Sequence, residues 1–127
     1  MPLELNYTND DARRTSQKGN PIPLYAYQNQ GIHFAKGLSV QVSSNTHLRF
    51  FAGFTITALP KDTIGLIVPV TNLNCPTLTL VSGSYIANLN TPIYMDMICH
   101  SGFTIIDYGQ YLANLYIIPV TPLELLR

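Results

Sequence analysis

The sequence predicts an all-β domain of the sandwich or barrel type, and two features carry this prediction. Apolar and polar residues alternate with period two in several segments, which is the pattern of half-buried strands. Glycine and proline recur at short intervals from Gly31 to Pro119, and they supply the turns that such a fold needs between its strands. Val, Ile, Thr, Tyr and Phe, which strands favour, are plentiful.

The expected strands follow one another from Pro21 onward. Alternation is clearest in Leu38–Ser43, Thr77–Leu80 and Ile93–Cys99. The best candidate for a helix is Gln110–Leu115, but it lies between a glycine and two β-branched isoleucines, so we predict a strand there as well. The sequence therefore predicts no helix.

The beginning of the chain has a different character. Residues 9–20 are polar and have no apolar period, and they carry three of the seven basic residues. We therefore expect residues 1–20 to form a flexible N-terminal arm and residues 21–127 to form the β-barrel domain.

Charged residues make up only 11% of the chain, although hydrophobic residues make up 46%. An ordinary soluble domain carries about 25% charged residues. The deficit predicts that other copies of the chain cover much of the surface. Because seven basic residues balance seven acidic ones, the sequence shows no electrostatic footprint for nucleic acid.

The sequence predicts neither a membrane span nor a metal site. No run of apolar residues reaches the length of a transmembrane helix, and the N-terminus lacks the features of a signal peptide. We therefore expect synthesis in the cytosol, with Cys75 and Cys99 reduced and buried. His33, His47 and His100 are scattered, so we expect no bound metal.

Three segments resemble the trimeric deoxyuridine triphosphatase (dUTPase) family, in the family's order and at similar spacing. Phe51–Gly65 is similar to a strand that ends in a Leu-Pro turn and is followed by a Gly. Gly65–Leu73 looks like the family's second motif, and Asp107–Ile117 looks like its fourth motif. The likeness covers roughly residues 21–120 and implies a distorted jelly-roll β-barrel that assembles as a homotrimer.

This family hydrolyses dUTP between the α- and β-phosphates, and it needs metal-bound phosphates, an activated water and a uracil pocket. By the resemblance, Ser39 stands where the first motif has a carboxylate, and a hydroxyl is a poorer ligand for a hard cation such as Mg²⁺. Val70, Thr71 and Asn72 stand where the second motif supplies Arg-Ser-Gly. A charge-assisted contact to phosphate is therefore lost at Val70.

The third motif corresponds to the segment from Gly83 to Ile86. Ile86 stands in place of the water-activating aspartate, and a hydrocarbon cannot accept a proton. After Val120 the chain lacks the glycine-rich arm of the fifth motif. We therefore predict no catalytic residue, metal or cofactor, only vestigial nucleotide-pocket positions: Ser39, Val70, Thr71, Asn72, Gly83, Tyr85 and Ile86.

From these departures we predict that the chain is not an enzyme and that it acts by binding another protein. Chains of this length and kind resemble the family encoded by the first reading frame of adenovirus early region four, whose members bind host signalling and PDZ-domain proteins. The resemblance implies a homotrimeric viral protein with a host or viral protein partner, located in the host cytoplasm or nucleus. The C-terminal Leu125-Leu126-Arg127 departs from the PDZ-ligand pattern, so the partner stays open. Two alternatives are a trimeric structural or assembly component of a virus and a residual dUTP pyrophosphatase.

Overall fold

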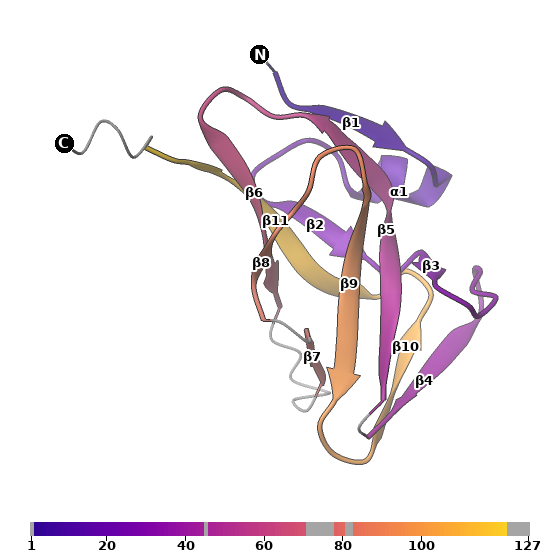
Figure 1. The fold of residues 1–127 in the computed structure, drawn as a ribbon. Coiled ribbons are helices and arrows are strands. Elements are labelled where there is room, and N and C mark those ends of the chain that lie inside the picture. The colour runs from indigo at the N-terminus through magenta and orange to yellow at the C-terminus, as the bar shows by residue number, and fades with distance from the viewer. Residues whose placement is uncertain (1, 45, 71–77, 81–82, 122–127) are drawn as a thin grey trace.

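The structure is a computed structural model that describes residues 2–44, 46–70, 78–80 and 83–121. Strands dominate it, and the described residues include one short helix (Figure 1). The prediction of an all-β fold is therefore confirmed. The elements are β1 (Glu4–Tyr7), α1 (Asp10–Thr15), β2 (Ile22–Tyr25), β3 (Gln28–Asn29), β4 (Ser39–Ser43), β5 (His47–Ala58), β6 (Thr63–Pro69), β7 (Leu78–Leu80), β8 (Tyr85–Ile86), β9 (Pro92–Cys99), β10 (Phe103–Asp107) and β11 (Tyr111–Pro119).

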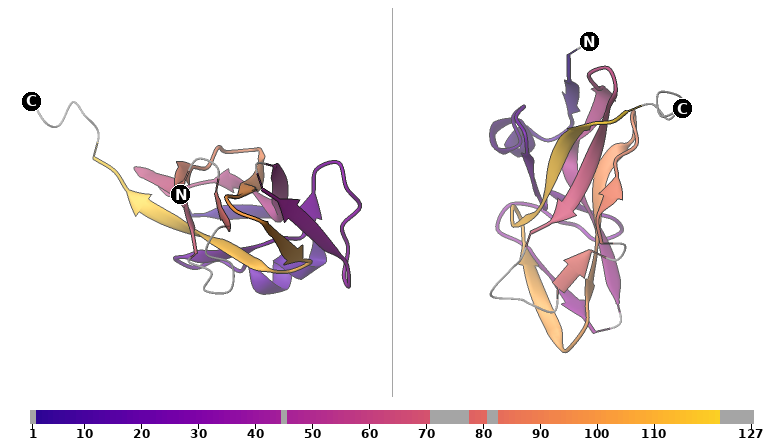
Figure 2. Two further views of the ribbon diagram at one scale, coloured as in Figure 1. Left: turned by 90° about the horizontal axis from the view of Figure 1, so that it is seen from below. Right: turned by 90° about the vertical axis from the view of Figure 1, so that its left-hand side faces the viewer.

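The strands form three antiparallel sheets. One has the order β1-β5-β9-β7, with β3 also paired to β5, another has the order β2-β11-β6-β8, and a two-stranded ribbon joins β10 to β4. Both Figure 1 and the right-hand view of Figure 2 place this ribbon at the end of the molecule opposite the N-terminus. The core lies between the sheets, because buried side chains such as Phe50 and Phe54 of β5, Met95 of β9 and Leu115 of β11 belong to one cluster.

Alternation in the sequence corresponds to burial in the strands. In β4, Val40 and Val42 are buried whereas Ser39 and Gln41 are exposed. In β9, every second residue from Ile93 to Cys99 is buried, and the burial predicted for Cys99 is confirmed. The predicted strand at 110–115 is also confirmed, because it lies almost entirely within β11.

The N-terminal residues differ from the predicted flexible arm. They form β1, which pairs with β5, and the six-residue helix α1. The side-chain oxygen of Asn9 accepts hydrogen bonds from the N–H groups of Asp11 (2.8 Å) and Ala12 (3.1 Å), and it thereby caps the helix. Sequence periodicity missed this helix because it is too short to show a 3.6-residue period, and Ala12 is its only buried residue.

Helix α1 sits on β5 at a glycine. Gly53 has φ of 85°, in the left-handed region, and a Cβ atom there would lie 2.7 Å from the Cβ of Asn9 and 2.9 Å from the Cβ of Ala12. No side chain fits in that space, so Gly53 permits both the local backbone conformation and the close approach of the helix.

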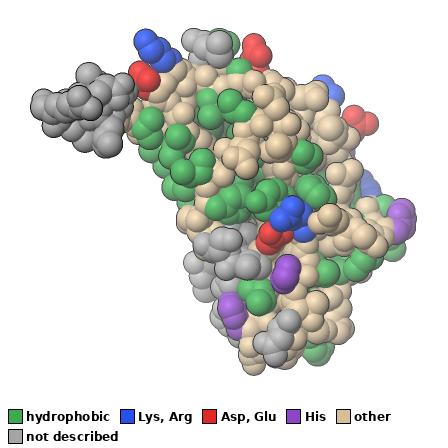
Figure 3. Space-filling model, viewed as in Figure 1, with side chains coloured by type: hydrophobic (Ala, Val, Ile, Leu, Met, Phe, Trp, Pro, Cys, Tyr) green, Lys and Arg blue, Asp and Glu red, His purple; other side chains and the backbone are tan. Residues whose placement is uncertain are grey.

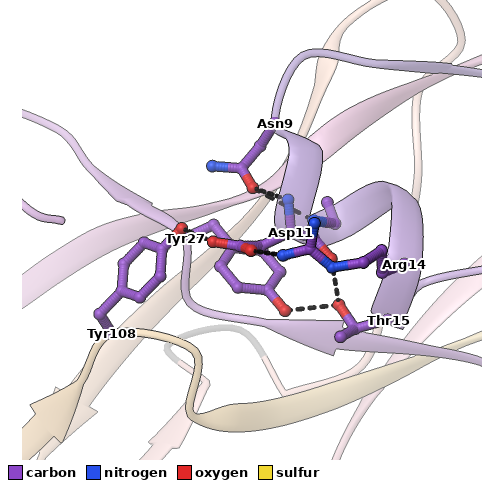
Figure 4. Close-up of polar contacts among 7 residues, drawn as sticks. Asn9, Asp11, Arg14, Thr15, Tyr27 and Tyr108 are labelled. Atoms are coloured by element: carbon purple, nitrogen blue, oxygen red, sulfur yellow. Dashed lines mark hydrogen bonds and ion pairs between the residues drawn. The ribbon is translucent and has the colours of Figure 1, made fainter. Parts of the chain in front are cut away.

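Polar contacts join α1 to two tyrosines from distant parts of the chain (Figure 4). The Tyr108 hydroxyl donates to the Asp11 carboxylate at 2.5 Å, and the hydroxyls of Thr15 and Tyr27 share a hydrogen bond. Asp11 also pairs with Arg14. Burial raises the pKa of Tyr27 and of Tyr108, and for Tyr108 the hydrogen bond to Asp11 raises it further. The N-terminal segment is therefore part of the folded domain.

No helix among the described residues has the length and apolar character needed to cross a membrane.

Candidate functional site at the β8–β9 hairpin

The predicted nucleotide-pocket positions fall in two sheets. Ser39 lies on the β4–β10 ribbon, where its exposed hydroxyl donates to Asp107 at 2.5 Å. Val70 follows β6, and its N–H donates to the carbonyl of Leu112 at 3.2 Å. Ser39 is thus separated from the other described positions. Thr71 and Asn72 lie outside the described residues.

The structure brings three of the predicted positions together at β8. Gly83 has φ of 66° and precedes the strand, while Tyr85 and Ile86 form it. Strand β8 pairs with β6, so that Ile86 lies opposite Leu66 and Tyr85 lies opposite Ile67. Tyr85 therefore points to the same side of the sheet as the fully buried Ile67, whereas Ile86 points outward and is 57% exposed. That these positions contact a nucleotide stays a prediction.

A small cavity lies between β8 and the start of β9. Its volume is about 10 Å³, and it is lined by Ile67, Tyr85 to Asn88, and Thr91 to Tyr94. Pockets for ligands of nucleotide size have volumes of roughly 300–1,000 Å³, whereas this cavity has room for about one water molecule. Tyr85 and Tyr94, which both line this cavity, stack on each other, with ring centroids 5.3 Å apart and planes inclined by 24°.

The Tyr85 hydroxyl is buried and has no hydrogen-bond partner among the described residues. Burial raises the pKa of this phenol far above its usual value, and the neighbouring Tyr94 and Asp96 raise it further, while Arg49 opposes the shift. The phenol therefore stays protonated at neutral pH. It is a buried neutral donor and cannot serve as a base.

Arg49 extends the aromatic stack across the neighbouring sheet. Its guanidinium carbon lies 4.0 Å from the centroid of the Tyr94 ring. Its Nε and Nη2 atoms contact the two carboxylate oxygens of Asp96 at 2.7 and 3.0 Å, a bidentate ion pair that raises the pKa of Arg49. The stack of Arg49, Tyr94 and Tyr85 thus joins β5, β9 and β8.

An open polar cleft of about 350 Å³ lies beside this ion pair and is lined by Gln30, His47, Leu48, Arg49 and Asp96. Sequence analysis did not identify Arg49, Tyr94 or Asp96 as site residues. The relevant signal is cross-strand register, because Arg49 lies directly opposite Asp96 in the β5–β9 pair. Among the described residues, no group of three or more His, Cys, Asp and Glu side chains is placed to hold a metal ion.

Comparison with known proteins supplies the class of fold. No family model matches the chain, and no curated protein sequence matches it. Solved structures do match. A mutant of the dUTPase of Staphylococcus bacteriophage 80alpha, bound to dUpNHpp, has a TM-score of 0.69 at 12% identity and covers 94% of this chain and 92% of its own. A mutant dUTPase of phage phi11 of S. aureus has a TM-score of 0.70 at 14% identity, and the match covers 96% of this chain and 94% of the phage protein. The dUTPase of Streptococcus mutans has a TM-score of 0.68 at 12% identity, and the match covers 97% of this chain and 98% of the streptococcal protein.

The chain therefore has the dUTPase fold, as the resemblance of its motifs implied. One prediction is corrected by the same comparisons. We predicted that the chain is not an enzyme, but its structural neighbours are dUTPases, which are enzymes. The phage dUTPases of the first comparison also control transfer of virulence genes by a proto-oncogenic G protein-like mechanism. Among these neighbours, one fold thus combines nucleotide chemistry with regulation.

Proposed function

We propose that this chain is a homotrimeric protein of dUTPase fold that acts by binding a host or viral protein. The observation that carries the proposal is a sheet with apolar side chains on both faces, of which the core covers only one. The homotrimer follows the resemblance to the dUTPase family. A location in the cytoplasm or nucleus of a host cell follows the resemblance to the adenovirus family and is part of this proposal.

The sheet in question is β2-β11-β6-β8. Its inner face supplies Leu24, Ile67, Leu115 and other fully buried side chains to the core. Among the described elements, helix α1 packs on β1 and β5 rather than on the opposite face of this sheet. By strand alternation and register, that outer face consists of Pro23, Tyr25, Ile64, Leu66, Val68, Ile86, Asn114, Tyr116 and Ile118.

This outer face holds no charged side chain, and Asn114 contributes its one amide. Leu66 pairs with Ile86 on one side and Tyr116 on the other, which forms an apolar row across three strands. An antiparallel sheet with one solvated face normally shows polar side chains on that face. Figure 3 shows hydrophobic side chains around β6 and β8 of this sheet and, in the same view, around β9 of the neighbouring sheet. Such a surface favours burial against protein.

A closed threefold ring would bury this face through head-to-tail contacts. The partner of the assembled trimer would then bind the remaining surface. Two observations support a protein partner. Tyrosines are enriched at interfaces, and Tyr111 at the start of β11 is 41% exposed. The cavity at β8, which Tyr85 helps to line, has a volume of about 10 Å³ and is too small for a nucleotide.

The first test is the solution mass of the purified chain by light scattering. We expect three times the 14.1 kDa of one chain. Leu66→Asp should shift this mass toward one chain, because an unpaired carboxylate would be buried in the interface. Lys61→Asp, on the exposed turn before β6, adds the same side chain outside the apolar face and should leave the mass unchanged. A wild-type monomer at all concentrations would refute the proposal.

A second candidate function is hydrolysis of dUTP, which the dUTPase neighbours favour. The assay is release of pyrophosphate from dUTP in the presence of Mg²⁺. Hydrolysis that requires the folded trimer and is inhibited competitively by dUpNHpp would assign the chain as an enzyme. Protein binding and hydrolysis are separate readouts, so either is measurable without the other.

A further inference from the structure

Strand β10 has an open edge with apolar side chains. It pairs with β4, and no other described strand pairs with it. Phe103 is 62% exposed and Ile105 is 52% exposed, and both lie on the outer face of the ribbon. Native proteins generally protect such edges with charge, proline or a covering element. Asp107, at the end of the strand, is the one charged residue that β10 carries.

The direction of the free backbone groups follows from the ladder. The N–H of Tyr108 donates to the carbonyl of Leu38, and the N–H of Ser44 donates to the carbonyl of Gly102, so the even-numbered residues of β10 bond to β4. Because the two edges of an antiparallel strand alternate, the N–H and C=O groups of Phe103, Ile105 and Asp107 point away from β4. Those of Asp107 are occupied, since its N–H donates to the Gln110 side chain and its carbonyl accepts from the Gln110 N–H. Among the described strands, the edge formed by Phe103 and Ile105 therefore has no pairing partner.

We propose that two copies of this chain pair antiparallel through this edge, with Phe103 of one copy opposite Ile105 of the other. In this register, the two residues with open backbone groups bond to each other across a twofold axis, and each hydrogen-bonded pair exchanges both of its N–H···O bonds. The contact joins the two ribbons into one sheet in the order β4-β10-β10-β4. It lies on a different sheet from the face assigned to the trimer, so it would link trimers to one another.

The side chains fit this register, and the backbone groups of Asp107 disfavour the register in which Ile105 lies opposite itself. Paired residues in an antiparallel sheet project to the same face, so each exposed Phe103 ring would cover an exposed Ile105. A register shifted by two residues, with Ile105 opposite itself, would require the backbone groups of Asp107 that Gln110 already occupies. The twofold contact is therefore self-complementary in both hydrogen bonding and apolar surface.

Register-specific disulfide capture tests the proposal directly. Phe103→Cys and Ile105→Cys chains are mixed and oxidised mildly, and wild-type chain gives the background from native cysteines. Directly opposite residues have Cα atoms about 5.5 Å apart, within disulfide range, whereas Ile105 and its own copy are diagonal neighbours at about 7–8 Å or more. We expect a covalent pair of one chain of each kind, in several-fold excess over either variant oxidised alone. Equal capture in the single-variant solutions, or none in the mixture, would overturn the proposal.

A second measurement uses the wild-type contact. Ile105→Lys should weaken the association between assemblies about tenfold, because a charged edge side chain opposes strand pairing. Ile32→Lys is the matched control, since Ile32 is 47% exposed and lies outside β10. Light scattering shows separately whether each variant keeps the mass of three chains. Failure of the edge contact and failure of the proposed trimer are therefore distinguishable. Equal effects of the two lysines would overturn the proposal.

Discussion

Replacing Gly53 by alanine tests whether the N-terminal helix is an integral part of the domain. Gly53 has a left-handed backbone, which costs an alanine about 1–2 kcal/mol. The added Cβ would also meet the Cβ atoms of Asn9 and Ala12 at 2.7 and 2.9 Å, which no real contact tolerates. Helix α1 must then move away, and loss of its capped, docked position costs about 1 kcal/mol or more. We expect a total destabilisation of about 2–3 kcal/mol.

Gly31→Ala supplies the matched control. Gly31 has nearly the same φ, 88°, but no atom lies within 4 Å of the point that an alanine Cβ would occupy. Both variants therefore carry the backbone cost, and only Gly53→Ala displaces the helix. The assay is urea unfolding at one fixed protein concentration, because assembly makes stability depend on concentration. If both variants lose the same free energy, α1 is not held against β5 and the reasoning is wrong.

Three further predictions follow from named contacts. Tyr85→Phe removes a buried hydroxyl without a described partner, so it should leave stability unchanged or raise it by about 1 kcal/mol, measured by urea unfolding. The folded-state pKa values of Tyr27, Tyr85 and Tyr108 are raised, so the native state holds protons that the unfolded state releases; stability should be constant below about pH 10 and fall above it, and the fall should be smaller in Tyr85→Phe. Asn9→Ala should cost about 1 kcal/mol through loss of the helix cap, whereas Asn9→Asp should retain it; equal losses in the two variants would contradict the cap assignment.

The strands were predictable because burial repeats with period two over enough residues to be recognised. In β9, four buried side chains from Ile93 to Cys99 alternate with half-buried ones. Helix α1 was not predictable, because its position depends on a glycine more than thirty residues away in the sequence, and its own six residues bury one side chain. Local pattern thus specified the sheets, and tertiary contact specified the helix.

The candidate site divides in the same way. Gly83, Tyr85 and Ile86 are close in sequence, so one motif located them together at β8. The stack of Arg49 on Tyr94 and the ion pair with Asp96 depend on how β5 pairs with β9, and register is fixed by the whole core rather than by these residues. Ser39, which the resemblance placed beside the same nucleotide, lies on a separate ribbon within one chain.

The packing energy of Tyr85 bears on the second candidate function, hydrolysis of dUTP. Stacking of Tyr85 on Tyr94 contributes about 0.5–1.5 kcal/mol, whereas the unsatisfied buried hydroxyl costs about 1–3 kcal/mol. Displacing the Tyr85 ring would also expose its buried apolar area, so a base that enters the slot must offset that loss as well. The phosphate-binding end of the site is the stronger evidence for or against hydrolysis of dUTP. Val70 offers a hydrocarbon side chain, and its N–H is already bonded to the Leu112 carbonyl.

A comparison of deoxyuridine with dUTP separates these two ends. If the described residues are the whole of the site, both ligands should bind with the same affinity in the presence of Mg²⁺. No group described near Val70 would form a favourable contact with the triphosphate. Calorimetric titration measures both affinities, and Tyr85→Ala, which empties the slot, should strengthen both equally. Tighter binding of dUTP by about a hundredfold, equivalent to a charge-assisted contact of about 3 kcal/mol, would refute this reasoning. The triphosphate would then be held by groups beyond those described, and hydrolysis would become the stronger assignment.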